Sequence, residues 1–332
     1  MQVSQLKKVI NDAALVIKGN KFTLPVLSNI RLQIGDEEIA ATAFDLSSSI
    51  TSIELLESGE SDHDYEADIL VDADKIYHLV NKLNDKDEIE LEIDNNQLKI
   101  YRGKSQYVLP CNEPDEYPSI PEDKINCEFT IDTEELIKSI NLCLTAVSKD
   151  ESKAILTGIN LQASDLEITV AATDGHRLAF RTIAIEDNVN FNITIPHRFA
   201  LFLTKLSLPD TLTIGISDVG IHINLDNLKV ASRLLDGNYP NYKSLIPPKQ
   251  QKQIINGDKW RESIDIIATM NLNNVVKISI DELTTLSSNV ESTAVNESHQ
   301  SPIGFKPIEF ATNVKYLLTM LKAVNGDLTI GL

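Results

Sequence analysis

The sequence contains a long internal duplication, and this feature limits its possible folds more than any other. Residues 27–45, LSNIRLQIGDEEIAATAFD, align without a gap with residues 156–174, LTGINLQASDLEITVAATD. Nine of the nineteen positions are identical, whereas roughly one identity would follow from ordinary composition. Such self-similarity indicates that one structural unit occurs at least twice in the chain.

A second block occurs three times, and each copy predicts a short amphipathic helix followed by a strand. The copies begin at Val71, Ile195 and Ala311. Each one ends in strict alternation of apolar and polar residues, which is typical of a strand with one buried face. A further amphipathic helix opens each unit, so the pattern predicts an α+β fold in which two helices pack on an antiparallel sheet. The three predicted modules are residues 1–124, 125–250 and 251–332.

The charge distribution bears on whether such a chain binds nucleic acid. Its net charge is −19, which argues against a DNA-coating protein unless the basic residues gather on one surface. In the thrice-repeated helix, basic residues fall seven positions apart, and two helical turns place them on the same side. One such pair is common on any amphipathic helix, but recurrence favours a shared surface that contacts phosphates without reading bases. The pairs are Lys75 with Lys82, Arg198 with Lys205, and Lys315 with Lys322.

An enzyme is the main alternative class. Asp174 and His176 could form an acid/base pair, with Ser152 or Ser232 as the nucleophile. However, Asp174 repeats Asp45, and that copy has no histidine nearby. An aspartate that accepts hydrogen bonds from turn amides explains both copies better. We therefore expect a non-catalytic protein.

The remaining motifs indicate neither a cofactor nor a membrane segment. Cys111, Cys127 and Cys143 form no CxxC pair, so the sequence predicts no metal site, redox couple or other cofactor. Neither a secretory signal nor an apolar run of membrane-spanning length is present. We expect a soluble, cytoplasmic protein that does not bind membranes.

Three segments resemble one known family. They are FTLPVLSNI at residues 22–30, AATDGHRLAF at 171–180 and SRLLDGNYPNY at 232–242. The chain is similar along its whole length to the bacterial DNA sliding clamps, the beta subunits of DNA polymerase III. The resemblance implies a processivity factor in which two head-to-tail subunits form a ring around double-stranded DNA. It also implies loading by a clamp loader complex and docking of polymerase catalytic subunits and repair factors through short peptides.

The resemblance also implies site residues. Basic residues that match DNA-contact positions of the family, together with the repeated basic pairs, are Lys21, Lys75, Lys82, His197, Arg198, Lys205, Lys315 and Lys322. Residues that match the family's partner-peptide pocket are Leu156, Thr173, Gly175, His176, Arg177, Leu178 and Pro247. The sequence departs from the family at Asp74, Asp150, Ala154 and Ile155. These departures imply weaker duplex contact near the helix of the second module.

The third module differs from the other two. A closing hairpin follows the alternating strand in the first two modules, but no residue follows Leu332. We therefore expect a third copy that lacks its final hairpin and leaves a strand edge exposed. Two interpretations of the missing hairpin stay open: truncation, or a natural variant with a weakened third module. The alternative function is that of a monomeric clamp-fold interaction protein, or a truncated clamp, that does not form a stable ring.

Overall fold

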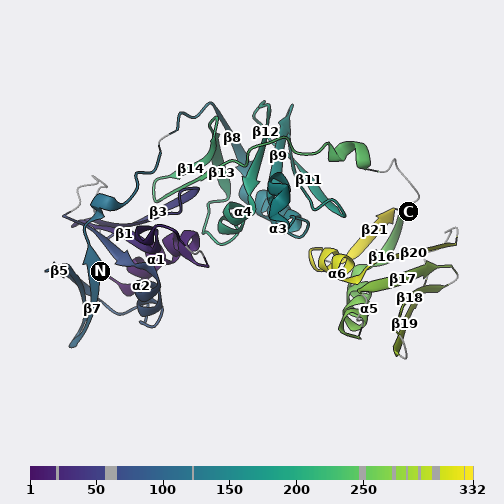
Figure 1. The fold of residues 1–332 in the computed structure, drawn as a ribbon, viewed down its shortest axis with the longest axis horizontal. Helices are drawn as coiled ribbons and strands as arrows, with labels where there is room; N and C mark the ends of the chain where they lie inside the picture. Colours follow the sequence, from purple (N-terminus) through teal and green to yellow (C-terminus); the bar gives the residue numbers. More distant parts are fainter. Residues whose placement is uncertain are drawn as a thin grey trace. The chain divides into compact units, whose positions relative to one another are not determined.

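The computed structural model describes residues 1–332 apart from positions 20–21, 57–65, 122, 247–251, 271–273, 282, 291–292, 301–306, 325 and 332. The described chain divides into two compact units. The first unit holds residues 1–137, 160–169 and 182–236, and the second holds residues 138–159, 170–181 and 237–332. Figure 1 traces the elements along the chain.

The first helix, α1 (Val3–Ile17), follows from the spacing of its apolar residues. Leu6, Val9, Ile10 and Ala13 recur every three or four positions, and all four are fully buried. This periodicity gives the helix one apolar face, which packs against the sheet formed by the strands that follow. Helix α2 (Ala73–Val80) lies beside α1 (Figure 1).

One long antiparallel sheet runs through the first unit in the order β5-β6-β7-β4-β1-β2-β3-β15-β14-β13-β8. It includes strands from two of the repeats, because β3 pairs with β15 and places Ile50 opposite Val230. The strands are β1 (Asn29–Ile34), β2 (Glu38–Phe44), β3 (Ser48–Leu55), β4 (Ala67–Asp72), β5 (Glu90–Asp94), β6 (Gln97–Arg102), β7 (Ser105–Asn112), β8 (Cys127–Asp132), β13 (Thr211–Ile216), β14 (Gly220–Leu225) and β15 (Leu228–Arg233).

The second copy of the duplicated sequence forms a four-stranded sheet in the order β11-β10-β9-β12. This order repeats the β3-β2-β1-β4 arrangement of the first copy, so the duplication in the sequence is a duplication of structure. Helix α3 (Thr133–Leu144) precedes the sheet and α4 (His197–Leu203) follows it. The strands are β9 (Gly158–Ser164), β10 (Glu167–Thr173), β11 (Leu178–Ala184) and β12 (Phe191–Pro196).

The third copy has its own core. Trp260, Ile264 and Ile267 on one face of α5 are buried against Val276 and Ile278. The sheet order β19-β18-β17-β20 again repeats that of the first copy, and β21 pairs antiparallel with β16. Within the described residues, no strand lies beside β21 as β14 lies beside β13. The elements are β16 (Lys252–Asn256), α5 (Gly257–Met270), β17 (Val275–Ile280), β18 (Leu283–Val290), β19 (Thr293–Gln300), β20 (Ile308–Asn313), α6 (Val314–Lys322) and β21 (Asp327–Gly331).

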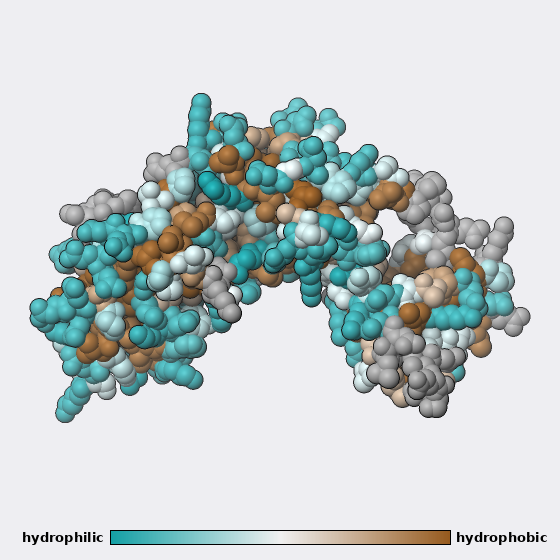
Figure 2. Space-filling view, in the orientation of Figure 1, coloured by the Kyte–Doolittle hydropathy of each residue, from teal (hydrophilic) through white to brown (hydrophobic). Residues whose placement is uncertain are grey.

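Short 3-10 helices occupy several connections, namely Pro25–Ser28, Pro114–Glu116, Glu151–Thr157 and Tyr242–Leu245. Hydrophilic residues cover most of the visible surface (Figure 2), as the acidic composition leads one to expect. None of the helices in the described ranges has the length and apolar character needed to cross a bilayer. The predicted α+β fold with three tandem copies of one module is confirmed.

Candidate peptide and DNA contact sites

The turn between β10 and β11 is fixed by Asp174. Its Oδ1 accepts hydrogen bonds from the backbone N–H groups of His176, at 2.9 Å, and Arg177, at 3.0 Å. Its Oδ2 accepts a third from Nε of Arg177 at 3.1 Å. Burial alone would raise the pKa of Asp174, but these hydrogen bonds outweigh it and hold the pKa below its ordinary value. The prediction of an aspartate that bonds turn amides is confirmed. The carboxylate of Asp174 holds the shape of this turn.

The same turn brings most of the predicted peptide-contact residues together. The hydroxyl of Thr173 donates to the carbonyl oxygen of Arg177 at 2.6 Å and accepts from the N–H of Gly175 at 3.1 Å. Gly175 has φ +89°, a left-handed conformation that favours glycine. His176 is exposed on the turn, and Leu178 begins β11. The segment from Thr173 to Leu178 is therefore one rigid, partly exposed unit.

Two of the predicted peptide-contact residues are not part of this turn. Leu156 is buried at the end of a 3-10 helix, where its carbonyl oxygen accepts a hydrogen bond from the N–H of Ser148 at 3.0 Å. Pro247 lies outside the described residues. The assignment of Leu156 and Pro247 to a peptide pocket stays a prediction.

An aromatic ring that the sequence did not single out lies against the turn. The guanidinium of Arg177 is 4.3 Å from the ring centroid of Tyr316, which belongs to α6. This distance is within the range of a cation–π interaction. Nη1 of Arg177 is buried and has no hydrogen-bond partner among the described residues. One donor of the turn is therefore left without an acceptor within the described residues.

An apolar cavity of about 350 Å³ lies within the second unit, next to the start of β11. Leu178 is the one predicted peptide-contact residue in its lining. The sequence pattern did not predict the other lining residues, because each is an apolar residue typical of the buried face of its helix or strand. They include Phe180 of β11, Trp260 of α5 and Leu317, Met320 and Leu321 of α6.

The repeated basic residues differ in their surroundings. Lys315 and Lys322 share α6, but Lys82 and Lys205 lie in the turns after α2 and α4, so the prediction that each basic pair lies on one helix is wrong for the first two pairs. Lys75, Lys82, Lys205 and Lys315 are exposed, and no ion pair involves them within the described residues. Exposed lysines that form no ion pair can contact a phosphate without first breaking one. His197 is exposed at the start of α4.

Arg198, Lys322 and Lys21 stand apart from this group. The guanidinium of Arg198 is half-buried, and its Nη2 donates to the carbonyl oxygen of Val16 in α1 at 3.2 Å. Nζ of Lys322 lies 3.0 Å from Oδ1 of Asp265 in α5. Lys21 lies outside the described residues. Part of the predicted basic surface is therefore already paired with groups of the chain itself.

The described residues contain no group of three or more His, Cys, Asp or Glu side chains placed to hold a metal ion. Burial raises the pKa of the Cys143 thiol to about 12, so this thiol stays protonated at neutral pH. Its Sγ lies 3.4 Å from the carbonyl oxygen of Val170 and acts as a donor. Cys143 thus behaves as a buried structural residue.

Comparison with known proteins identifies the family. The model for the N-terminal domain of the DNA polymerase III beta subunit matches residues 1–121, and the model for its central domain matches residues 130–241. The beta sliding clamp of Bacillus subtilis is 30% identical over 98% of this chain and 90% of its own length. The chain belongs to the beta sliding clamp family. The clamp of Staphylococcus epidermidis is also similar, with 29% identity over 96% of this chain and 88% of its own.

Solved clamp structures agree with this assignment. The crystal structure of the Bacillus subtilis clamp has a TM-score of 0.89 and 28% identity, and the match covers 100% of this chain and 91% of that one. A Pseudomonas aeruginosa clamp bound to griselimycin has the same fold, with a TM-score of 0.91 at 23% identity over 100% and 91% of the two chains. This chain therefore has the same fold as these two clamps, and its sequence is similar to that of the Bacillus subtilis clamp.

Proposed function

We propose that this sliding clamp is a non-catalytic processivity factor. Two copies close head to tail into a ring around double-stranded DNA, and the ring tethers polymerase catalytic subunits and repair factors. A clamp loader complex opens and places the ring. The observation that carries the proposal is the antiparallel pairing of β3 with β15, because it shows which strand edges join one module to the next.

The pairing of β3 with β15 joins equivalent strand edges of neighbouring modules. Strand β3 ends the sheet β4-β1-β2-β3, and β15 ends the run β8-β13-β14-β15. By position, the counterpart of β3 in the third copy is β19, and the counterpart of β15 in the first copy is β7. Both edges are unpaired over most of their length within the described residues. If β19 of each subunit pairs with β7 of the other, two chains form a closed ring with two equivalent junctions.

The exposed lysines supply the contact with DNA. Lys75 and Lys315 lie on α2 and α6, and Lys82 and Lys205 lie in the turns that directly follow α2 and α4, so a ring of two subunits presents eight of these lysines. Lysines that contact phosphates attract duplex DNA of any sequence and form no fixed contact with bases. This property suits a protein that must slide.

The rigid turn from Thr173 to Leu178 and the neighbouring apolar cavity are proposed to bind partner peptides. An aliphatic or aromatic side chain of the peptide enters the cavity, whose lining is mostly apolar. His176 is exposed on the turn and supplies a polar group for the peptide. Apolar cavities with a few fixed polar groups at their rims are typical ligand sites.

The interaction between Arg177 and Tyr316 can be tested by peptide binding. A cation–π contact is worth about 0.5–2 kcal/mol, so a Tyr316→Ala variant is expected to bind a labelled Gln-Leu-Ser-Leu-Phe peptide about two- to thirtyfold more weakly. Tyr316→Phe keeps the ring over Arg177 and should bind within about twofold of the unchanged chain. Fluorescence anisotropy measures both. Equal weakening in the two variants would show that the ring over Arg177 does not matter.

Retention on DNA without free ends tests the ring. The chain is placed on nicked circular plasmid by a polymerase III clamp loader, and the plasmid is separated by gel filtration. We expect the protein to stay with circular plasmid and to leave within minutes after a restriction enzyme cuts it once. Equal retention on the circular and linear forms would indicate ordinary DNA binding. If sedimentation finds a single subunit at every concentration, the chain is the monomeric clamp-fold interaction protein.

A further inference from the structure

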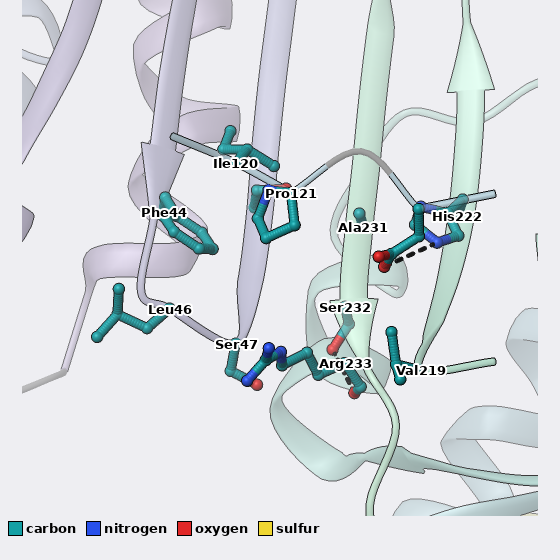
Figure 3. Close-up of a pocket in the computed structure, with 12 residues that line it drawn as sticks. Phe44, Leu46, Ser47, Ile120, Pro121, Val219, His222, Ala231, Ser232 and Arg233 are labelled. Carbon is teal, nitrogen blue, oxygen red and sulfur yellow. Dashed lines mark hydrogen bonds and ion pairs between the residues drawn. The ribbon is translucent and has the colours of Figure 1, made fainter. Parts of the chain in front are cut away.

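A second cavity lies where the turn between β2 and β3 meets the β14–β15 hairpin, within the first unit. It measures about 40 Å³, and its lining includes Phe44, Leu46, Pro121, Val219 and Arg233 (Figure 3). A volume of about 10–15 Å³ is enough for one water molecule, so the cavity has room for a small aliphatic group but not for an aromatic ring. Nothing in the proposed ring or its proposed peptide site uses this cavity.

The turn at this cavity is the first copy of the turn proposed to bind peptides. Asp45 is the counterpart of Asp174, and its Oδ1 accepts hydrogen bonds from the N–H groups of Ser47, at 3.0 Å, and Ser48, at 2.6 Å. The residues that follow the aspartate by one, two and three positions therefore have the same local geometry in both copies. Pro121, at the end of the first repeat, lies against this turn in Figure 3.

The rim of the cavity exposes two apolar side chains. Leu46 has φ +71°, and Val219 lies in the turn between β13 and β14; they are 46% and 50% exposed. A branched residue with a positive φ is strained, and such strain concentrates at binding sites. Glycine occupies the matching position of the other copy, at residue 175, so the strain is specific to this cavity.

Arg233 adds a charge to the same rim. Its exposed side chain extends towards Ser47 (Figure 3). Within the described residues no carboxylate forms an ion pair with it. An acidic group of a bound molecule would complement this charge, and at a site with apolar surface close by the interaction is less screened than in open water.

We propose that this second cavity, between the β2–β3 turn and strands β14 and β15, is a second peptide-binding site of the clamp. Its occupant is a short extended segment of a partner protein, with a small aliphatic side chain in the cavity and an acidic residue facing Arg233. The choice of a peptide rests on the proposed function of the matching turn at Asp174. The choice of side chains rests on the cavity volume, the exposed Leu46 and Val219, and the charge of Arg233.

The test uses the full chain with ¹³C-labelled methyl groups and the probe acetyl-Gly-Asp-Val-Asp-Gly-amide. Titration is expected to shift the methyl resonances of Leu46 and Val219. Arg233→Glu should weaken binding at least tenfold, whereas Lys229→Glu, an equal charge change on the same strand, should leave it within about twofold. The reversed probe, acetyl-Gly-Lys-Val-Lys-Gly-amide, should bind better to R233E than to the unchanged chain.

Two results would overturn the inference. One is the absence of shifts at Leu46 and Val219 at millimolar probe, and the other is equal weakening by R233E and K229E. The methyl groups of Leu178 and Met320 report on the proposed site in the second unit during a separate titration with Gln-Leu-Ser-Leu-Phe. Shifts there without shifts at Leu46 would reject the second site and leave the proposed function intact. Absence of shifts at Leu178 and Met320 would count against the proposed function itself.

Discussion

A Val108→Pro variant is expected to sediment as single subunits at concentrations where the unchanged chain forms dimers. Strands β6 and β7 are joined by the turn at Gly103 and Lys104, and Arg102 lies opposite Ser105. In such a hairpin the backbone groups of alternate residues point away from the partner strand. Val108, opposite Lys99, is one of these residues, so its N–H faces the open edge proposed to meet β19.

Proline removes that N–H and adds a ring at the same edge. Loss of one hydrogen bond costs about 1.5 kcal/mol or less, and about 1.4 kcal/mol corresponds to tenfold in affinity. Because a closed ring has two junctions, the dimer dissociation constant should rise about a hundredfold. Sedimentation velocity across a concentration series measures this change.

Val108→Thr is the matched control, since it keeps the N–H and should dimerise normally. Circular dichroism of both variants checks that the sheet is intact, because the N–H of Val108 makes no bond to β6. A proline variant that dimerises as well as the unchanged chain would show that β7 is not the ring junction.

Reversal of the exposed basic residues is expected to abolish stable DNA binding at physiological salt. In the triple variant Lys75→Glu, Lys82→Glu and Lys205→Glu, each change removes a proposed phosphate contact and adds a repelling charge. The slope of log affinity against log salt concentration should decrease by about 0.9 for each phosphate contact that is lost. Fluorescence anisotropy of a labelled duplex, measured between low and physiological salt, gives both the affinity and the slope.

The control variant changes three other exposed lysines, Lys86, Lys104 and Lys229, to glutamate. The net charge falls by the same amount, but none of these residues is at one of the repeated basic positions. The control should keep most of its affinity and its salt slope. If both triple variants lose affinity equally, overall charge governs binding, and the positions of Lys75, Lys82 and Lys205 do not.

The sequence predicts the modules well because their determinants are local. The spacing of Leu6, Val9, Ile10 and Ala13 alone specifies the buried face of α1, and alternation specifies the buried face of each strand. Alternation does not specify which strand edges meet. The pairing of β3 with β15 depends on contacts between distant segments, and no periodicity in either strand indicates it.

The same distinction between local and distant contacts applies to the candidate sites. Duplication of Asp45 and Asp174 was enough to predict aspartates that hold turns, since their partners are the next two or three residues. Arg198 also has basic partners at the expected spacing, but its contact with Val16 of α1 was not foreseeable from that spacing. Tyr316 is one aromatic residue on an amphipathic helix, and only the folded chain places it over Arg177.

In the turns at Asp45 and Asp174, the groups that hold the loop in shape differ from the side chains that the loop exposes to a partner. In both copies Oδ1 of the aspartate accepts hydrogen bonds from main-chain amides, which every amino acid except proline supplies. Mutations at the three following positions can therefore accumulate without dismantling the loop, as Leu46, Ser47 and Ser48 against Gly175, His176 and Arg177 already illustrate. Two loops of one shape can therefore present different side chains, so partner choice in such proteins can diverge faster than their architecture.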